Sequence, residues 1–190
     1  MTYSIATLCG SLRRGSVNAQ LLRAAEDTAP ADWRFEHLSG LEDLPHYSQD
    51  IEEQDGFPGP VEHLAKALRS ADGLIIASPE YNYGVTGVLK NAIDWLSRVD
   101  DQPFEGLPVS LMSASPSPMG GIRAQYPLRQ IFVALQADVM QRPEVAVAFA
   151  YERFEENRLV HEPTRDVLRK HLNAFEALIT RRSAHRAKAA

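Results

Sequence analysis

Residues 10–18, "GSLRRGSVN", combine the side chains that commonly hold an anion. The hydroxyls of Ser11 and Ser16 and the amide of Asn18 can donate hydrogen bonds, and one of the two adjacent arginines supplies positive charge. An apolar run precedes the stretch and an amphipathic pattern follows it, so it is expected to join a strand to a helix N-terminus. The free N–H groups and the positive dipole end of such a terminus attract anions. The stretch predicts a phosphate monoester site, and a solvated turn with Ser16 as a helix cap is the alternative.

Other phosphate chemistries do not fit this stretch. It contains neither the G-K-[ST] of a P-loop nor the G-x-G-x-x-G of a dinucleotide site. Cysteine phosphatases resemble it in placing a cysteine before a helix, with five residues between that cysteine and an arginine. Counting from Cys9, this spacing reaches Gly15, so the arginines at 13 and 14 are out of register. We therefore interpret Cys9 as a small strand residue.

Two further stretches have side chains or backbone suited to ligand binding. Residues 78–95, "SPEYNYGVTGVLKNAIDW", place tyrosines, an asparagine and glycines before an amphipathic pattern. This favours a rim for a flat heteroaromatic ring, or a surface loop whose tyrosines pack on a neighbouring subunit. Residues 112–130 contain Gly120 and Gly121, which allow close approach of backbone N–H groups to a ligand edge. An ordinary loop is the alternative for this third stretch.

The elements around these stretches alternate between strand and helix. Strand patterns occur, in order, at residues 3–8, 32–38, 73–79, 107–113 and within 138–150. Helical patterns follow after Ser16 and at 59–72, 88–99, 122–136 and 164–182, with Pro127 either in a first turn or at a kink. This order predicts an α/β fold with a parallel sheet covered by helices on both faces. Ligands of such sheets bind at the carboxyl ends of the strands, where the three stretches would meet. The long polar connection 39–60 is either an active-site loop or a disordered one.

Length and charge narrow the class of protein. The 190 residues, 44% of them hydrophobic, predict a single domain over residues 1–182 and a frayed tail over 183–190. The formal charge of -5 argues against nucleic acid or an anionic membrane as a partner. A single cysteine and the lack of a long apolar stretch or a leader pattern indicate a cytoplasmic protein.

Taken together, "GSLRRGSVN", "PEYNYGVTGVLKNAIDWLSR" and "GGIRAQYPLRQ" resemble the NADPH-dependent FMN reductase family. This flavodoxin-like group includes chromate, quinone and azo-dye reductases. The segment "DLPHYSQDIE" is also similar to the family's segment after its second strand, and the resemblance runs from about Ser4 to Pro143. It implies a flavodoxin-like, doubly wound, five-stranded parallel sheet in the order 2-1-3-4-5, with helices on both faces.

The resemblance also implies roles for individual residues. Those that would hold the FMN phosphate are Ser11, Arg13, Ser16, Val17 and Asn18. Those that would line the isoalloxazine ring are Pro79, Glu80, Tyr81, Asn82 and Tyr83, with Ser115 and Gly120 at its pyrimidine side. The chain departs from the family pattern in two places. Gly84 stands where the family usually has a serine or threonine, and Thr86 stands where it usually has a proline. In the third stretch the family commonly has a glycine at the position of Ser117, and the prolines at 116 and 118 are unusual.

The implied function is an oxidoreductase in which FMN accepts hydride from NADPH or NADH at N5. The electrons would then pass to a small acceptor such as a quinone, chromate, an azo compound or a nitro compound. No side chain is required as a catalytic acid or base, no metal ligand is expected, and a homodimer or homotetramer is implied. Two alternatives remain, namely a flavodoxin-like electron carrier and a cofactor-free interaction protein on the same fold.

Overall fold

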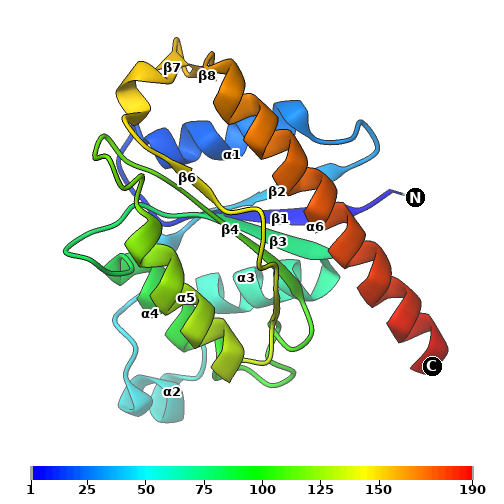
Figure 1. Ribbon diagram of the computed structural model, residues 1–190. Helices are drawn as coiled ribbons and strands as arrows, with labels where there is room; N and C mark the ends of the chain where they lie inside the picture. The colour runs from blue at the N-terminus through cyan, green and yellow to red at the C-terminus, as the bar shows by residue number, and fades with distance from the viewer. Residues whose placement is uncertain (1, 190) are drawn as a thin grey trace.

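A parallel β-sheet forms the centre of the fold (Figure 1). The computed structural model describes residues 2–189, with the backbone alone described at 185–189. The strands are β1 (Ser4–Cys9), β2 (Arg34–Leu38), β3 (Gly73–Ala77), β4 (Pro108–Ala114) and β5 (Asp138–Val139). They pair in the order β2-β1-β3-β4-β5, which confirms the predicted flavodoxin-like topology.

The fifth position of the sheet is occupied by two short strands. β5 pairs with the beginning of β4, and β6 (Val145–Val147) pairs in parallel with its end. Residues 141–144 leave the ladder between them, and Pro143 has no N–H to donate to it. The strand expected within residues 138–150 is therefore in the predicted place but is interrupted.

Helices cover both faces of the sheet (Figure 1). α1 (Val17–Thr28) and α6 (Glu162–Ala189) pack on one face, and α3 (Gly59–Ser70), α4 (Gly87–Leu96) and α5 (Ile122–Ala134) pack on the other. Successive strand residues point to opposite faces. Accordingly, Ile75 of β3 joins the core under α1 and α6, while Leu74 and Ile76 join the core under α3, α4 and α5.

The long connection after β2 is ordered and is bound to α4. It contains a 3₁₀ turn, η1 (Leu41–Asp43), and a short helix, α2 (Gln49–Asp55). The side-chain N–H groups of Asn91 and Trp95 both donate to the Pro45 carbonyl, at 2.9 and 2.8 Å. The Tyr47 N–H donates to the Asn91 side chain at 2.8 Å, and the Tyr47 ring meets Trp95 edge-on. The disordered alternative for this connection was therefore wrong, because α4 supplies hydrogen-bond partners and an aromatic surface.

The C-terminal part of the chain adds a hairpin and a long helix. A 3₁₀ turn, η2 (Ala150–Glu152), and the two-stranded hairpin of β7 (Phe154–Glu155) and β8 (Arg158–Leu159) lie between β6 and α6. Residues 183–189 were expected to be a frayed tail, but their backbone continues α6. The alanine, arginine and lysine residues in this segment favour helix. Ala190 lies outside the described residues, and the domain limits of 1–182 stay a prediction. No described helix is long and apolar enough to cross a membrane.

Candidate functional site

The turns after β1, β3 and β4 meet at the carboxyl edge of the sheet and enclose a cavity of about 270 Å³. Its walls are Ser11, Arg13, Ser16, Val17, Asn18, Pro79, Glu80, Tyr81, Ala114, Ser115, Pro116 and Tyr151. All the residues predicted for the site line this cavity except Asn82, Tyr83 and Gly120. The three stretches chosen from the sequence are thus brought together.

The first turn positions the N-terminus of α1 at the cavity. Ser16 is the helix cap, and its buried hydroxyl oxygen accepts from the N–H groups of Asn18 and Ala19 at 3.2 and 3.3 Å. Val17 is the first helical residue, so its N–H has no partner within the helix. The capping interpretation of Ser16 is confirmed, and a free N–H lies beside the cap at the wall of the cavity.

The side chain of Asn18 is hydrogen-bonded to the backbone at the end of β4. Its buried amide donates to the Ala114 carbonyl and accepts from the Ala114 N–H, both at 2.9 Å. The side chain thereby continues the hydrogen-bonding pattern of β4 and fixes the start of α1 against that strand. A role for Asn18 at the phosphate itself stays a prediction.

Arg13 is exposed at the mouth of the cavity and is held in place by two contacts. Its Nη1 donates to the Tyr151 hydroxyl at 2.8 Å and its Nη2 donates to the Gly15 carbonyl at 2.9 Å. Hydrogen bonding to Tyr151 raises the already high pKa of Arg13, so the guanidinium is charged. Sequence reasoning missed Tyr151, because it lies 138 positions after Arg13 and no motif surrounds it.

The second turn is a tight hairpin with a strained backbone. Tyr81 and Gly84 exchange two backbone hydrogen bonds at 3.2 and 3.0 Å, and the residues between them have positive φ angles, 50° at Asn82 and 69° at Tyr83. Two positive φ angles define a type I′ turn, whose second position favours glycine, so tyrosine there carries strain. Tyr81 lines the cavity, whereas Asn82 and Tyr83, predicted to line the ring, are not among its walls.

An ion pair ties this hairpin to α5. The Glu80 carboxylate, 8% exposed, lies 2.6 Å from the Arg123 Nε and also accepts from the Arg123 backbone N–H at 3.1 Å. The Tyr83 ring lies against the same guanidinium, 3.8 Å from its central carbon to the ring centroid. The Tyr83 side chain therefore braces the second turn against the third.

Thr86, one of the departures from the family pattern, joins the second turn to the first. Its buried hydroxyl donates to the Gly10 carbonyl at 2.8 Å. Gly10 also donates to Ala77, and a Cβ at Gly10 would lie 2.4 Å from the Ser78 hydroxyl. The close approach requires glycine at position 10, and the bond from Thr86 holds the second turn against the first.

We expect Thr86→Val to lower the free energy of unfolding by about 1 to 3 kcal/mol, because it leaves a buried carbonyl without its donor. Urea denaturation measures this, with Thr2→Val, the same change at an exposed position, as the control. Equal stability of the two variants would show that the bond to Gly10 contributes nothing.

The third turn lines the cavity with Ser115 but not with Gly120. The Ser115 hydroxyl is engaged with the hydroxyl and the N–H of Ser117 at 3.1 and 3.2 Å. Gly120 has a φ of +59°, and a Cβ there would lie 2.6 Å from the backbone of Ala146. The absence of a side chain at Gly120 thus serves packing against β6, which explains why it is not a wall of the cavity.

Cys9 is not arranged as a nucleophile. Its thiol donates to the Ser11 carbonyl at 3.6 Å, and burial raises the pKa of the thiol. A phosphatase needs a thiolate and therefore a lowered pKa. The interpretation of Cys9 as a strand residue agrees with its position at the end of β1.

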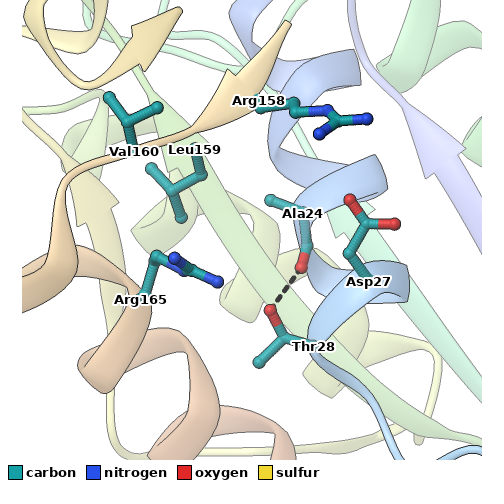
Figure 2. A pocket seen from close by; sticks show the side chains of 7 residues that line it. All are labelled: Ala24, Asp27, Thr28, Arg158, Leu159, Val160 and Arg165. Carbon is teal, nitrogen blue, oxygen red and sulfur yellow. Dashed lines mark hydrogen bonds between the residues drawn. The ribbon is translucent and has the colours of Figure 1, made fainter.

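A second cavity, of about 520 Å³, is shown in Figure 2, and no residue of the three turns lines it. It is lined by the C-terminal end of α1, by residues 158–160 and by Arg165 of α6. Thr28 in its wall donates to the Ala24 carbonyl of its own helix at 2.6 Å (Figure 2). None of the residues predicted for the site lines this cavity, so we place the candidate site at the carboxyl edge of the sheet.

Known proteins are similar to this chain over almost all of its length. Residues 3–152 match the family model described as NADPH-dependent FMN reductase. The quinone reductase of Escherichia coli strain K12 is 44% identical over 179 residues, which cover 93% of this chain and 95% of that protein. The NAD(P)H-dependent FMN reductase of Pseudomonas aeruginosa is 39% identical, over 92% and 94% of the two chains.

A solved structure shares the fold. FerB of Paracoccus denitrificans, a flavoenzyme NAD(P)H:(acceptor) oxidoreductase, superposes with a TM-score of 0.86 at 28% identity. The match covers 95% of this chain and 99% of that one.

Proposed function

The chain belongs to the NADPH-dependent FMN reductase family, and on this premise we propose that it passes electrons from NAD(P)H through FMN to quinones. Membership makes it an FMN-dependent NAD(P)H oxidoreductase. The observation that carries the proposal is the cavity at which the capped end of α1 and Arg13 face the hairpin at Tyr81.

The residues of this cavity fit FMN. A phosphate requires positive charge and hydrogen-bond donors, which Arg13 and the free N–H of Val17 provide beside the positive end of the helix. A flat ring requires rigid, largely apolar walls, which Pro79 and Tyr81 provide on the opposite side. We propose that the phosphate lies at the first turn and the ring at the second.

When bound, FMN supplies the redox chemistry by accepting hydride from NAD(P)H and giving both electrons to the acceptor. The chain's own contribution is to bind and orient. Arg13 and the start of α1 balance the phosphate charge, while the Glu80–Arg123 pair keeps the hairpin wall in place. Tyr81 is 55% exposed, so the rim is open to the nicotinamide and then to the acceptor. We propose no side chain as an acid, because water at this rim can protonate a quinol.

The proposal predicts that anaerobic NADPH or NADH bleaches the flavin absorbance of the FMN-loaded protein and that a benzoquinone restores it. An electron carrier would keep its absorbance with either nucleotide and lose it only with dithionite. A cofactor-free interaction protein would stay colourless after incubation with FMN and gel filtration. Either result would overturn the proposal.

We further propose a cytoplasmic homodimer or homotetramer, with chromate, azo or nitro compounds as additional acceptors. The exposed tyrosines at 83 and 126 support a subunit contact beside the rim. Light scattering during size-exclusion chromatography measures the mass of the assembly, and a monomer would overturn this proposal.

A further inference from the structure

The contact between Arg13 and Tyr151 lies between two cavities. The cavity of the candidate site and an adjoining one of about 310 Å³ share Arg13, Val17 and Tyr151 as walls. The remaining walls of the adjoining cavity are Gly15, Gln20, Phe154, Glu156 and Asn157. A ligand that extended from one cavity into the other would have to pass this contact.

The backbone around Tyr151 is firmly held. The N–H of Phe149 donates to the Ser117 carbonyl at 3.3 Å, and the N–H of the buried Ala150 donates to the Ser115 carbonyl at 3.0 Å. Phe149 has a φ of +49°, which an aromatic residue adopts only where its surroundings impose it. This strained residue begins the turn that presents Tyr151, so the third turn of the candidate site also fixes Tyr151.

The hydrogen bonding at this contact suits a terminal phosphate. Because Arg13 donates to the Tyr151 oxygen, the hydroxyl hydrogen of Tyr151 is not used in that bond. The guanidinium of Arg13 lies near the Tyr151 ring, and the distance from the Arg13 Cζ to the ring centroid is 5.7 Å. A phosphate in the candidate site would therefore meet a positive charge that the Tyr151 oxygen holds in place.

We propose that Tyr151 is a positioning residue that holds Arg13 across the end of the cavity and so selects FMN over both riboflavin and FAD. Riboflavin has no phosphate for Arg13, and the adenylate of FAD would have to displace the contact to enter the adjoining cavity. The proposal rests on the proposed function, because it assumes that the cavity holds a flavin.

Two variants separate the hydrogen bond from the barrier. Tyr151→Phe removes the hydroxyl and keeps the ring, whereas Tyr151→Ala removes both. Dissociation constants for riboflavin, FMN and FAD are measured by quenching of flavin fluorescence on binding to flavin-free protein. Tyr3→Phe is the control, because it also removes a hydrogen-bonded hydroxyl, the one bonded to Thr180, and Tyr3 lines neither cavity.

We expect Tyr151→Phe to weaken FMN binding roughly two- to tenfold without changing riboflavin binding, and to leave FAD discrimination in place. We expect Tyr151→Ala to weaken FMN binding by a similar factor. It should also reduce the preference for FMN over FAD, because without the tyrosine ring the candidate site and the adjoining cavity are joined. The control should match the original protein with all three flavins.

Three results would count against these ideas in distinguishable ways. If the original protein binds no FMN, the proposed function fails. If it binds FMN but Tyr151→Phe leaves the FMN-to-riboflavin ratio unchanged, the positioning role is overturned. If Tyr151→Ala folds and still binds FAD as weakly relative to FMN as the original protein does, the proposed barrier to FAD is overturned. If that variant does not fold, Tyr151→Phe still decides whether Tyr151 positions Arg13.

Discussion

Replacing Arg13 with alanine is expected to weaken FMN binding by roughly ten- to a hundredfold and to leave riboflavin binding unchanged. The guanidinium lies at the wall of the cavity beside the capped start of α1, where charge-assisted hydrogen bonds to a phosphate are possible. Only the phosphorylated flavin can make those bonds. Equilibrium titration followed by flavin fluorescence gives both dissociation constants.

Arg14→Ala is the matched control for this change. Arg14 is the next residue, and it is also exposed but does not line the cavity. Each variant loses one arginine, so the two variants have the same net charge. We expect Arg14→Ala to bind FMN almost as tightly as the original protein. An equal loss in both variants would indicate long-range attraction, and no loss in Arg13→Ala would contradict the placement of the phosphate.

Combining Arg13→Ala with Tyr151→Phe tests whether the two residues act together. If Tyr151 acts through Arg13, the double variant should bind FMN as weakly as Arg13→Ala alone, so the two effects should not add. Additive losses would mean that the Tyr151 hydroxyl binds the phosphate independently of Arg13.

The fold and the place of the site follow from patterns that are local in the sequence. Buried strands such as "GLIIA" and amphipathic helices between them leave few arrangements other than a parallel sheet. The turns after β1, β3 and β4 must then meet at one edge. The capping role of Ser16 could also be predicted, because a cap involves only the next three residues.

Contacts between distant segments could not be predicted in this way. Nothing near Asn18 indicates that its amide pairs with Ala114, and nothing near Gly120 indicates the approach of β6. Tyr83 resembles a ring contact by type and position, yet a type I′ turn takes its side chain to Arg123. These side chains could serve either a ligand or the protein, and only the tertiary arrangement distinguishes the two.

Below pH 6.5 the protein is expected to lose stability because of His171, a buried residue of α6. Its two ring nitrogens lie 2.6 Å from the Ser110 hydroxyl and 2.6 Å from the Pro143 carbonyl. A carbonyl only accepts, so Nδ1 carries the hydrogen and Nε2 accepts from Ser110. Burial, against the opposing effect of the bond to Pro143 and with a smaller contribution from the nearby Arg129, lowers the pKa of His171 from 6.5 to about 4.

The direction of the pH effect follows from this lowered pKa. Below pH 6.5 the unfolded chain takes up a proton at His171 and the folded chain does not, so the free energy of unfolding falls as the pH falls. The loss reaches about 3 kcal/mol near pH 4, where the folded protein also becomes protonated, and is about 2 kcal/mol at pH 5. Above pH 6.5 this contribution is fully present.

Urea denaturation of His171→Gln and the original protein at pH 7 and pH 5 isolates this contribution, because the other titrating groups cancel in the difference. Glutamine does not titrate, so the variant should be less stable at pH 7 and should lose about 2 kcal/mol less on going to pH 5. The original protein, measured beside the variant in the same buffers, supplies the reference pH dependence. If His171→Gln shares that dependence, the folded protein must accommodate a charged imidazole between α6 and β4, and burial is not what controls its protonation.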